Sequence, residues 1–136
     1  MAAIALLHAL SWMFNGFCYA DGQICWPGWG IALFGILGLP TAQLSWIANP
    51  LFWVSVLLLV CDDAEKDVFA VFTSLGALVL GNAFWVQGVN TDEGGGALYP
   101  VSSIGFGYGL WMTGIVLSVV VALHGVSVRE RRRPGA

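Results

Sequence analysis

The sequence predicts an all-α integral membrane protein with four transmembrane helices and one short re-entrant or interfacial helix. Two observations carry this prediction. The 136 residues are 58% hydrophobic and only 10% charged, with a mean hydropathy of +0.81, whereas soluble domains average about 25% charged residues. Residues 102–128 contain no Asp, Glu, Lys or Arg, and an apolar run of that length can cross a bilayer.

The chain is predicted to form one polytopic membrane domain, residues 1–128, followed by a basic tail, residues 129–136. Four of the five basic residues lie in that tail: Arg129, Arg131, Arg132 and Arg133. A basic cluster directly after a span marks the cytoplasmic side of a membrane. No broader basic face is present, so a nucleic-acid partner is not expected.

The first predicted span covers residues 2–17. At 1.5 Å per residue it is about 24 Å long, which is short for a hydrocarbon core of about 30 Å. A cleaved signal peptide is the alternative, because Cys18-Tyr19-Ala20 resembles a small-residue cleavage site. The preceding segment lacks the Lys or Arg that such signals carry, which favours the span.

Residues 28–61 are too many for one span and too few for two. Pro40 and Pro50 divide this stretch, and proline belongs at the first turn of a helix or at a kink. We therefore expect a full span over residues 40–61, kinked at Pro50. Residues 30–38 are then a half-helix that does not cross the membrane and that dips into the outer leaflet or lies along it.

The third and fourth spans are expected at residues 68–86 and 102–126. The third follows an acidic turn, residues 62–67, which suits the positive end of a helix dipole. A hydrophilic loop over residues 87–100, with three consecutive glycines, separates the two spans.

The distribution of basic residues predicts that both termini are cytoplasmic. Lys66, the only lysine, lies in the turn after the second span, on the same side as the arginine tail. The two loops assigned to the outside, residues 18–29 and 87–100, contain no Lys or Arg. This arrangement obeys the positive-inside rule at each connection.

Cys18 and Cys25 both lie in the first outer loop, where an oxidising compartment permits a disulfide. A redox-active pair needs the tighter Cys-x-x-Cys spacing, so a structural bridge is favoured. Cys61 is interpreted as a small buried residue at the inner end of the second span.

His8 and His124 are the only histidines, and both fall in the predicted inner half of the bilayer. Imidazoles on two helices could ligate haem or a metal ion. Neither has a neighbouring carboxylate or further histidine to complete a site, so hydrogen bonds between helices are favoured. No cofactor and no metal ion is expected.

Polar amides within the spans suggest a ligand pocket at the broken second span. The residues concerned are Gln43, Trp46, Asn49 and Asn82. Discontinuous membrane helices bind ligands in this way, but the same side chains can instead join helices through hydrogen bonds. Packing between helices is the favoured interpretation of these side chains.

Small residues recur every four positions in the third and fourth spans, which lets helix backbones approach closely. The stripes include Ala77 and Gly81 in the third span, and Gly105, Gly109 and Gly114 in the fourth. They predict a hairpin of these two helices, with Gly109 against the third span near Ala77 or Gly81. Part of the fourth helix remains available to a partner subunit.

The motif Ser45-Trp46-Ile47-Ala48-Asn49-Pro50, after a glycine-rich helix and before an apolar run, resembles uncharacterised small bacterial inner-membrane proteins. These proteins share a Trp-x-Ala-Asn-Pro motif and a late aromatic segment like Tyr108-Gly109-Leu110-Trp111. The resemblance covers about two-thirds of the chain. It implies a bacterial inner membrane and four helices, and it implies no chemistry.

The expected function is therefore that of a non-catalytic membrane protein, an accessory subunit or immunity-type factor, which acts by helix packing or partner binding. Its partners are the lipid bilayer and a membrane protein or further copies of the chain. One alternative is a small transporter or channel component with a site in residues 30–50. Another is a haem- or quinone-linked redox protein using His8 and His124. The sequence contains no nucleotide-binding or hydrolase motif, so no catalytic residue is assigned.

Overall fold

The computed structural model describes residues 1–19, 22–41, 43–61, 64–90 and 98–132. This part of the chain is mostly helical and also contains a small three-stranded sheet and a two-stranded one. The helices are α1 (Ala2–Ser11), α2 (Gly28–Phe34), α3 (Ala48–Val60), α4 (Ala64–Gln87) and α5 (Phe106–Arg132), with 3₁₀ helices η1 (Gly35–Thr41) and η2 (Leu44–Ile47). The strands are β1 (Asn15–Tyr19), β2 (Ile24–Pro27), β3 (Val89–Asn90), β4 (Leu98–Tyr99) and β5 (Ser103–Ile104).

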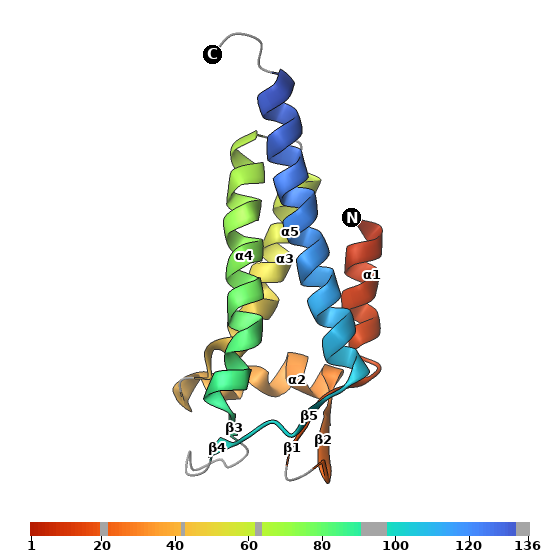
Figure 1. Cartoon of the computed structure of the whole chain (residues 1–136), viewed down its shortest axis with the longest axis vertical. Coiled ribbons are helices and arrows are strands. Elements are labelled where there is room, and N and C mark those ends of the chain that lie inside the picture. The colour runs from red at the N-terminus through yellow and green to blue at the C-terminus, as the bar shows by residue number, and fades with distance from the viewer. Residues whose placement is uncertain (20–21, 42, 62–63, 91–97, 133–136) are drawn as a thin grey trace.

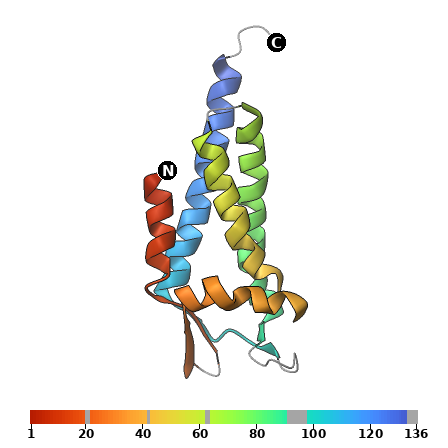
Figure 2. The ribbon, with the colours of Figure 1, turned by 180° about the vertical axis from the view of Figure 1, so that it is seen from behind.

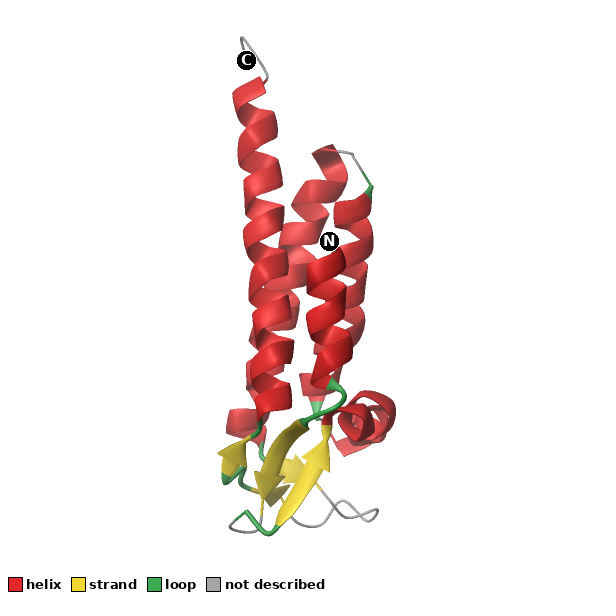
Figure 3. Ribbon diagram, turned by 90° about the vertical axis from the view of Figure 1, so that its right-hand side faces the viewer, coloured by secondary structure: helices red, strands yellow, loops and turns green. Residues whose placement is uncertain are grey.

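Helices α3, α4 and α5 run side by side along the length of the molecule, and the shorter α1 lies beside α5 (Figure 1). The strands and α2 gather at one end of this bundle, which we call the cap end. The end of α3, the start of α4 and the end of α5 lie at the opposite, far end (Figures 1 and 2). Seen from the side, the sheet extends beyond the helices at the cap end (Figure 3).

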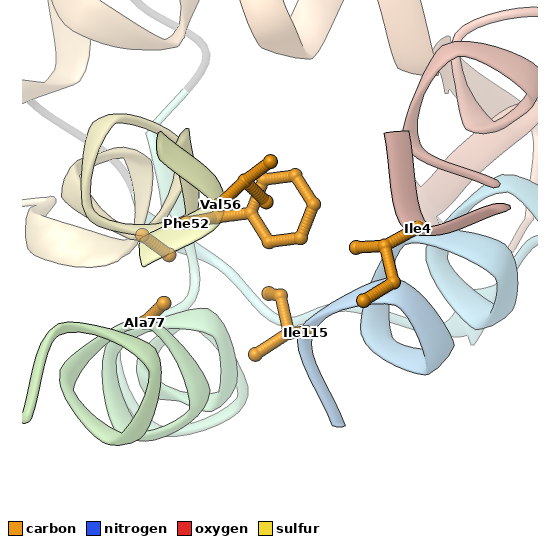
Figure 4. Close-up of a cluster of buried hydrophobic side chains, with 6 residues drawn as sticks. Ile4, Phe52, Val56, Ala77 and Ile115 are labelled. Atoms are coloured by element: carbon orange, nitrogen blue, oxygen red, sulfur yellow. The ribbon is translucent and has the colours of Figure 1, made fainter. Parts of the chain in front are cut away.

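The core joins four helices through side chains that are almost completely buried. It consists of Ile4, Ala48, Phe52, Val56, Ala77 and Ile115 (Figure 4). Small residues face the crowded contact of α3 with α4: Ala70 and Ala77 have no exposed surface, and the Ser55 hydroxyl donates to the Ala70 carbonyl over 3.2 Å. The bundle therefore combines close backbone approach with one large aromatic side chain, Phe52, at its centre.

The expected first span is wrong in its second half. Helix α1 ends at Ser11, and the chain turns into strand β1 at Asn15. Strand pairing explains the change, because β1 hydrogen-bonds to β2 on one side and to β5 on the other. Ten helical residues cover about 15 Å, so α1 follows only part of the bundle.

The expected second span is also shorter than predicted. Helix α3 begins at Ala48 rather than near Pro40, and it is preceded by η1 and η2. Pro50 is the third residue of α3. It occupies the first turn, where its missing N–H leaves no hydrogen bond unmade, so the predicted kink at Pro50 is wrong.

The half-helix expected at residues 30–38 is present as α2 and η1. The segment starts beside the sheet and ends beside η2, which packs against α4. It lies across the cap end and does not run along the bundle (Figures 1 and 2). The segment therefore lies at one end of the helices, and its expected place in the outer leaflet stays a prediction.

Helix α4 contains the third predicted span and extends beyond it. Helix α5 begins at Phe106, so the start predicted at residue 102 is wrong, because Ser103 and Ile104 pair with β1 as strand β5. Gly88, with a φ of 69°, terminates α4. Helix α5 continues to Arg132, so the first residues of the expected basic tail are helical. Half of the loop expected over residues 87–100, including its three glycines, lies outside the described residues.

Among the described helices, two are long and apolar enough to cross a membrane, over Glu65–Gln87 and Phe106–Arg131. Core helices of soluble proteins pass the same test, but those are mostly buried, whereas only 24% and 28% of these two windows are buried. The shorter apolar helices fall below the length limit. Four full transmembrane helices are therefore not supported. The two long apolar helices are the evidence for membrane association.

The predicted hairpin of the third and fourth helices is present as α4 packed on α5. A Cβ atom at Gly81 would lie 3.0 Å from the Trp111 ring, and Ala77 is fully buried. Gly114 instead faces α1 and α3. A Cβ atom there would lie 3.6 Å from the Ile4 carbonyl oxygen and 3.7 Å from the Phe52 ring. The hairpin prediction is thus confirmed, while Gly114 serves other helices.

The expected contact of Gly109 with the third span is wrong. Gly109 is exposed, and a Cβ atom there would meet nothing within 4 Å. Gly105 does lie in a tight contact, but its neighbour is the Asn15 carbonyl of β1. The closest approach on α5 itself is at Gly107, where a Cβ atom would lie 2.7 Å from the carbonyl oxygens of Ser11 and Phe14.

Replacing Gly107 with Ala is therefore expected to lower the free energy of unfolding by about 1–3 kcal/mol, because backbone atoms cannot move aside as a flexible side chain would. Gly109→Ala is the matched control two positions along the same helix. It should raise stability by about 0.5–1 kcal/mol through helix propensity alone. Unfolding by denaturing detergent in mixed micelles measures both values. Equal effects would show that α1 does not pack on α5 at Gly107.

Candidate functional site

The sheet at the cap end is closed by a disulfide. Cys18 and Cys25 face each other on the antiparallel strands β1 and β2, and their sulfur atoms are bonded at 2.04 Å. The hairpin between them turns through Gly22, whose φ of 83° favours glycine. The predicted bridge is confirmed in the structure. Cys61, expected to be buried, is instead exposed.

The third strand, β5, ties this hairpin to the beginning of α5. Phe17 pairs with Ile104 and Cys18 with Ser103. The Cys18 carbonyl oxygen accepts hydrogen bonds from both the backbone N–H and the hydroxyl of Ser102, at 2.9 and 3.0 Å. The disulfide-bonded residue is thereby held against the segment that leads into α5.

Loss of the disulfide should destabilise the cap measurably. A bridge over seven positions is worth about 2–3 kcal/mol on the chain-entropy estimate. We expect Cys18→Ser combined with Cys25→Ser to lower the free energy of unfolding by that amount. Cys61→Ser is the control and should have little effect, since that thiol is exposed. A thiol-reactive mass tag that labelled all three cysteines without reduction would contradict the bridge.

Gln43 and Trp46, two residues of the predicted pocket, hold the irregular segment between α2 and α3 in place. The Trp46 indole N–H donates to the Ala32 carbonyl over 3.0 Å, and its ring lies directly against Gly35. The Gln43 side-chain amide donates to the Gly88 carbonyl over 3.5 Å. Both side chains thus connect neighbouring segments of the chain at the cap end.

Asn82 belongs to a separate polar cluster between α4 and α5. Its side-chain N–H donates to the Leu78 carbonyl over 2.8 Å, and its carbonyl accepts from the Tyr108 hydroxyl over 3.2 Å. The Tyr108 hydroxyl in turn accepts from the Trp85 indole N–H over 3.3 Å. Asn49 lies half-buried in the first turn of α3. The four residues lie toward the cap end in different contacts, and a shared ligand pocket stays a prediction.

His8 is the most completely buried polar side chain of α1, with 1% of its surface exposed. Its ring stacks on Phe52 with centroids 4.7 Å apart and planes at 13°. Trp53 and Trp12 meet it edge-on at 5.0 and 5.9 Å. The Nδ1 atom has no hydrogen-bond partner among the described residues. The imidazole therefore joins α1 to α3 as an aromatic ring, and not through the hydrogen bond expected from the sequence.

The two histidines do not share a site within one chain. His8 lies in α1 between Ile4, which packs at Gly114, and Ser11, which packs at Gly107. His124 is ten residues beyond Gly114 on α5, which corresponds to about 15 Å along the helix, and it is exposed. A haem or metal ion held between both imidazoles of one chain does not fit this arrangement.

The far end contains a half-buried ion pair that sequence reasoning missed. The Arg129 Nε lies 2.5 Å from the Asp67 carboxylate, whose side chain is only 7% exposed. Gly125 makes room for this carboxylate, since a Cβ atom there would lie 3.2 Å from its oxygen. The charge pattern of the sequence could have predicted this pair. Acidic residues begin α4 and basic residues end α5, and two antiparallel neighbouring helices bring these ends together.

The other basic residues assigned to topology differ in their surroundings. Arg131 is exposed on the last turns of α5, and Arg132 ends that helix. Arg133 lies outside the described residues. Among the residues that the structure describes, no group of three or more His, Cys, Asp and Glu side chains lies together to hold a metal ion.

The fold and this site define a class of architecture: an antiparallel helical bundle that carries a disulfide-closed sheet at one end. Comparison of the chain with protein-family models, with curated proteins and with solved structures gives no match in any of the three.

Proposed function

We propose that the chain is a multi-pass membrane protein without catalytic activity that binds a partner protein through its cap. The apolar outer surface of the bundle supports the membrane location. Phe69, Phe72, Val79 and Val86 of α4 are all more than half exposed, Val86 at 92%. Such a surface is unfavourable in water and suits acyl chains.

The proposed topology places the far end in the cytoplasm and the cap outside. Lys66, Arg129 and Arg131 lie at the far end, while the described residues of the cap contain no Lys or Arg. This distribution follows the positive-inside rule, and a disulfide outside the cytoplasm agrees with an oxidising compartment. Helices α3, α4 and α5 connect the two ends, and α1 follows α5 part of the way. The bacterial inner membrane is proposed from the resemblance described above.

Reporter fusions test this topology. Alkaline phosphatase, which is active only outside the cytoplasm, should be inactive when fused after Ala136 and active when inserted at Gly95. The opposite pattern would reject the proposed orientation.

The disulfide-closed sheet is the observation that carries the binding proposal. Three strands with two outer edges, β2 and β5, form a stiff platform that is joined to α5 through Ser102. Ile24 on β2 and Ile104 on β5 expose apolar side chains there, at 47% and 48%. A rigid edge strand with exposed apolar side chains is a common protein-binding element, and an accessory subunit or immunity-type factor would use it to contact a partner.

Photo-crosslinking in cells tests the binding proposal. Benzoylphenylalanine at Ile24 or Ile104 should give one discrete protein adduct, which mass spectrometry identifies as a further copy of the chain or another protein. The same probe at Val79, on the outer surface of α4, is the control and should give none. Adducts at Val79 but not at the cap would move the binding surface to the helices.

A second candidate, a redox protein linked to haem or quinone, has His8 in its favour, because its buried Nδ1 has no hydrogen-bond partner among the described residues. It would have to act without His124. The absorbance spectrum of the purified protein tests this candidate directly. The transporter alternative has less support, because Gln43 and Trp46 of its expected site already bind backbone carbonyls.

A further inference from the structure

Helix α2 and η1 form an apolar ledge across the cap end of the bundle, residues 28–37 (Figures 1 and 2). The chain from Gly22 to Cys61 contains no Asp, Glu, Lys, Arg or His. An uncharged helix that lies across a bundle, rather than along it, needs a specific explanation.

The ledge is fastened to the rest of the molecule along its inner side. The backbone N–H groups of Gly28 and Trp29 donate to the carbonyls of Phe14 and Trp12, at 2.8 and 3.2 Å. The Trp46 indole donates to Ala32, and buried Gly30 lies against Trp26 and Pro27. The ledge thus has a defined orientation, and its outer side cannot simply rotate inward.

The outer side of the ledge carries large apolar side chains. Trp29 and Leu33 are four residues apart in α2, which places them on one helix face, and Leu37 follows in η1. Leu33 is 59% exposed and Leu37 is 71% exposed. Phe34 and Ile36 are also about half exposed. The exposed surface of the ledge is therefore apolar, and no element among the described residues covers it.

We infer that the ledge lies parallel to the membrane plane in the boundary between headgroups and acyl chains of the outer leaflet, with lipid as its partner. The inference rests on the proposed membrane location. The position of the ledge along the bundle supports this inference. The two candidate membrane spans reach the cap end at Gln87 and Phe106, and the ledge lies at that same end. Trp29 and Trp85 lie at the same end and are about half exposed, as expected of an aromatic belt.

This placement also assigns the sheet to the aqueous side. Helix α2 leaves β2 directly, with Pro27 in extended conformation before its first turn. The ledge therefore sets the depth of the protein in the bilayer, and the disulfide-bonded strands extend beyond it. A helix that lies in the interface in this way binds through its buried apolar area.

Nitroxide spin labels test the inference in the full chain, with Cys61→Ser and the native disulfide retained. Labels on Leu33→Cys and Leu37→Cys report the ledge, on Val79→Cys the bundle surface, and on Ile24→Cys the sheet. The protein is reconstituted in phosphatidylcholine vesicles, and collision rates with oxygen and with the water-soluble complex NiEDDA are compared. The two ledge labels should lie at equal, shallow depth, between a deep label at Val79 and a water-exposed label at Ile24.

Each other outcome overturns a defined part of the argument. If the ledge labels resemble Ile24 while Val79 is deep, the ledge lies in water and the inference fails, but the membrane proposal stands. A Leu37 label much deeper than the Leu33 label would mean a dipping helix and not a parallel one. Ledge labels shielded from both reagents would mean that protein, not lipid, covers this face. Exposure of Val79 to NiEDDA would reject the membrane location itself.

Discussion

Replacing Arg129 with Met is expected to lower the free energy of unfolding by about 3–5 kcal/mol, because it leaves the buried Asp67 carboxylate without its cation. The pair joins the first turn of α4 to the last turns of α5 at 2.5 Å. The loss should appear in detergent-induced unfolding and as a lower melting temperature in micelles.

Arg131→Met is the matched control, since it removes the same charge two residues away from an exposed position. Its effect should stay within about 0.5 kcal/mol. The double variant Arg129→Met with Asp67→Leu should be more stable than Arg129→Met alone, because no uncompensated charge remains. Equal losses for the two arginine variants would mean that the ion pair contributes nothing beyond net charge.

Replacing His8 with Ala should be nearly as damaging, at about 3 kcal/mol by analogy with aromatic truncations in packed cores. The substitution removes the ring that fills the space between Phe52, Trp53 and Trp12. His8→Phe keeps the stacking and removes a nitrogen that has no partner among the described residues. It should therefore be neutral within about 1 kcal/mol, or stabilising.

The exposed histidine of α5 provides the control for this series. His124→Ala should change stability by less than about 0.5 kcal/mol. If His8→Phe were as destabilising as His8→Ala, the imidazole nitrogen would have a partner of its own. That result would favour the redox candidate, whose haem or quinone would then be sought by spectroscopy.

Local sequence signals predicted several parts of this fold correctly. The charge-free run before the arginine cluster marked α5, and the acidic turn marked the start of α4. Two prolines in an apolar stretch indicated a broken segment, which is present as α2, η1 and η2. The spacing of Cys18 and Cys25 allowed a bridge that the hairpin then forms. Each of these features depends on neighbouring residues, so the sequence contains the information directly.

Contacts between segments far apart in the sequence explain the features of the fold that were not predicted. Residues 12–17 are mostly apolar, and only hydrogen bonds to β2 and to the distant β5 make residues 15–17 part of a strand. The stripe of small residues on α5 identified close contacts, but it could not show which neighbour they face. Gly105 and Gly107 contact the backbone of residues 11–15, whereas Gly109 faces open space.

The sequence by itself determined the apolar character of the chain, its helical content, the charge asymmetry and the pair of cysteines, because each of these is a property of composition or of short spacing. The tertiary structure decided the rest. It made His8 an aromatic contact between helices, paired Asp67 with Arg129 across 62 positions, and laid α2 across the end of the bundle. These outcomes depend on which segments meet in space, and the free energy of burying a side chain is set only by the neighbours that the fold supplies.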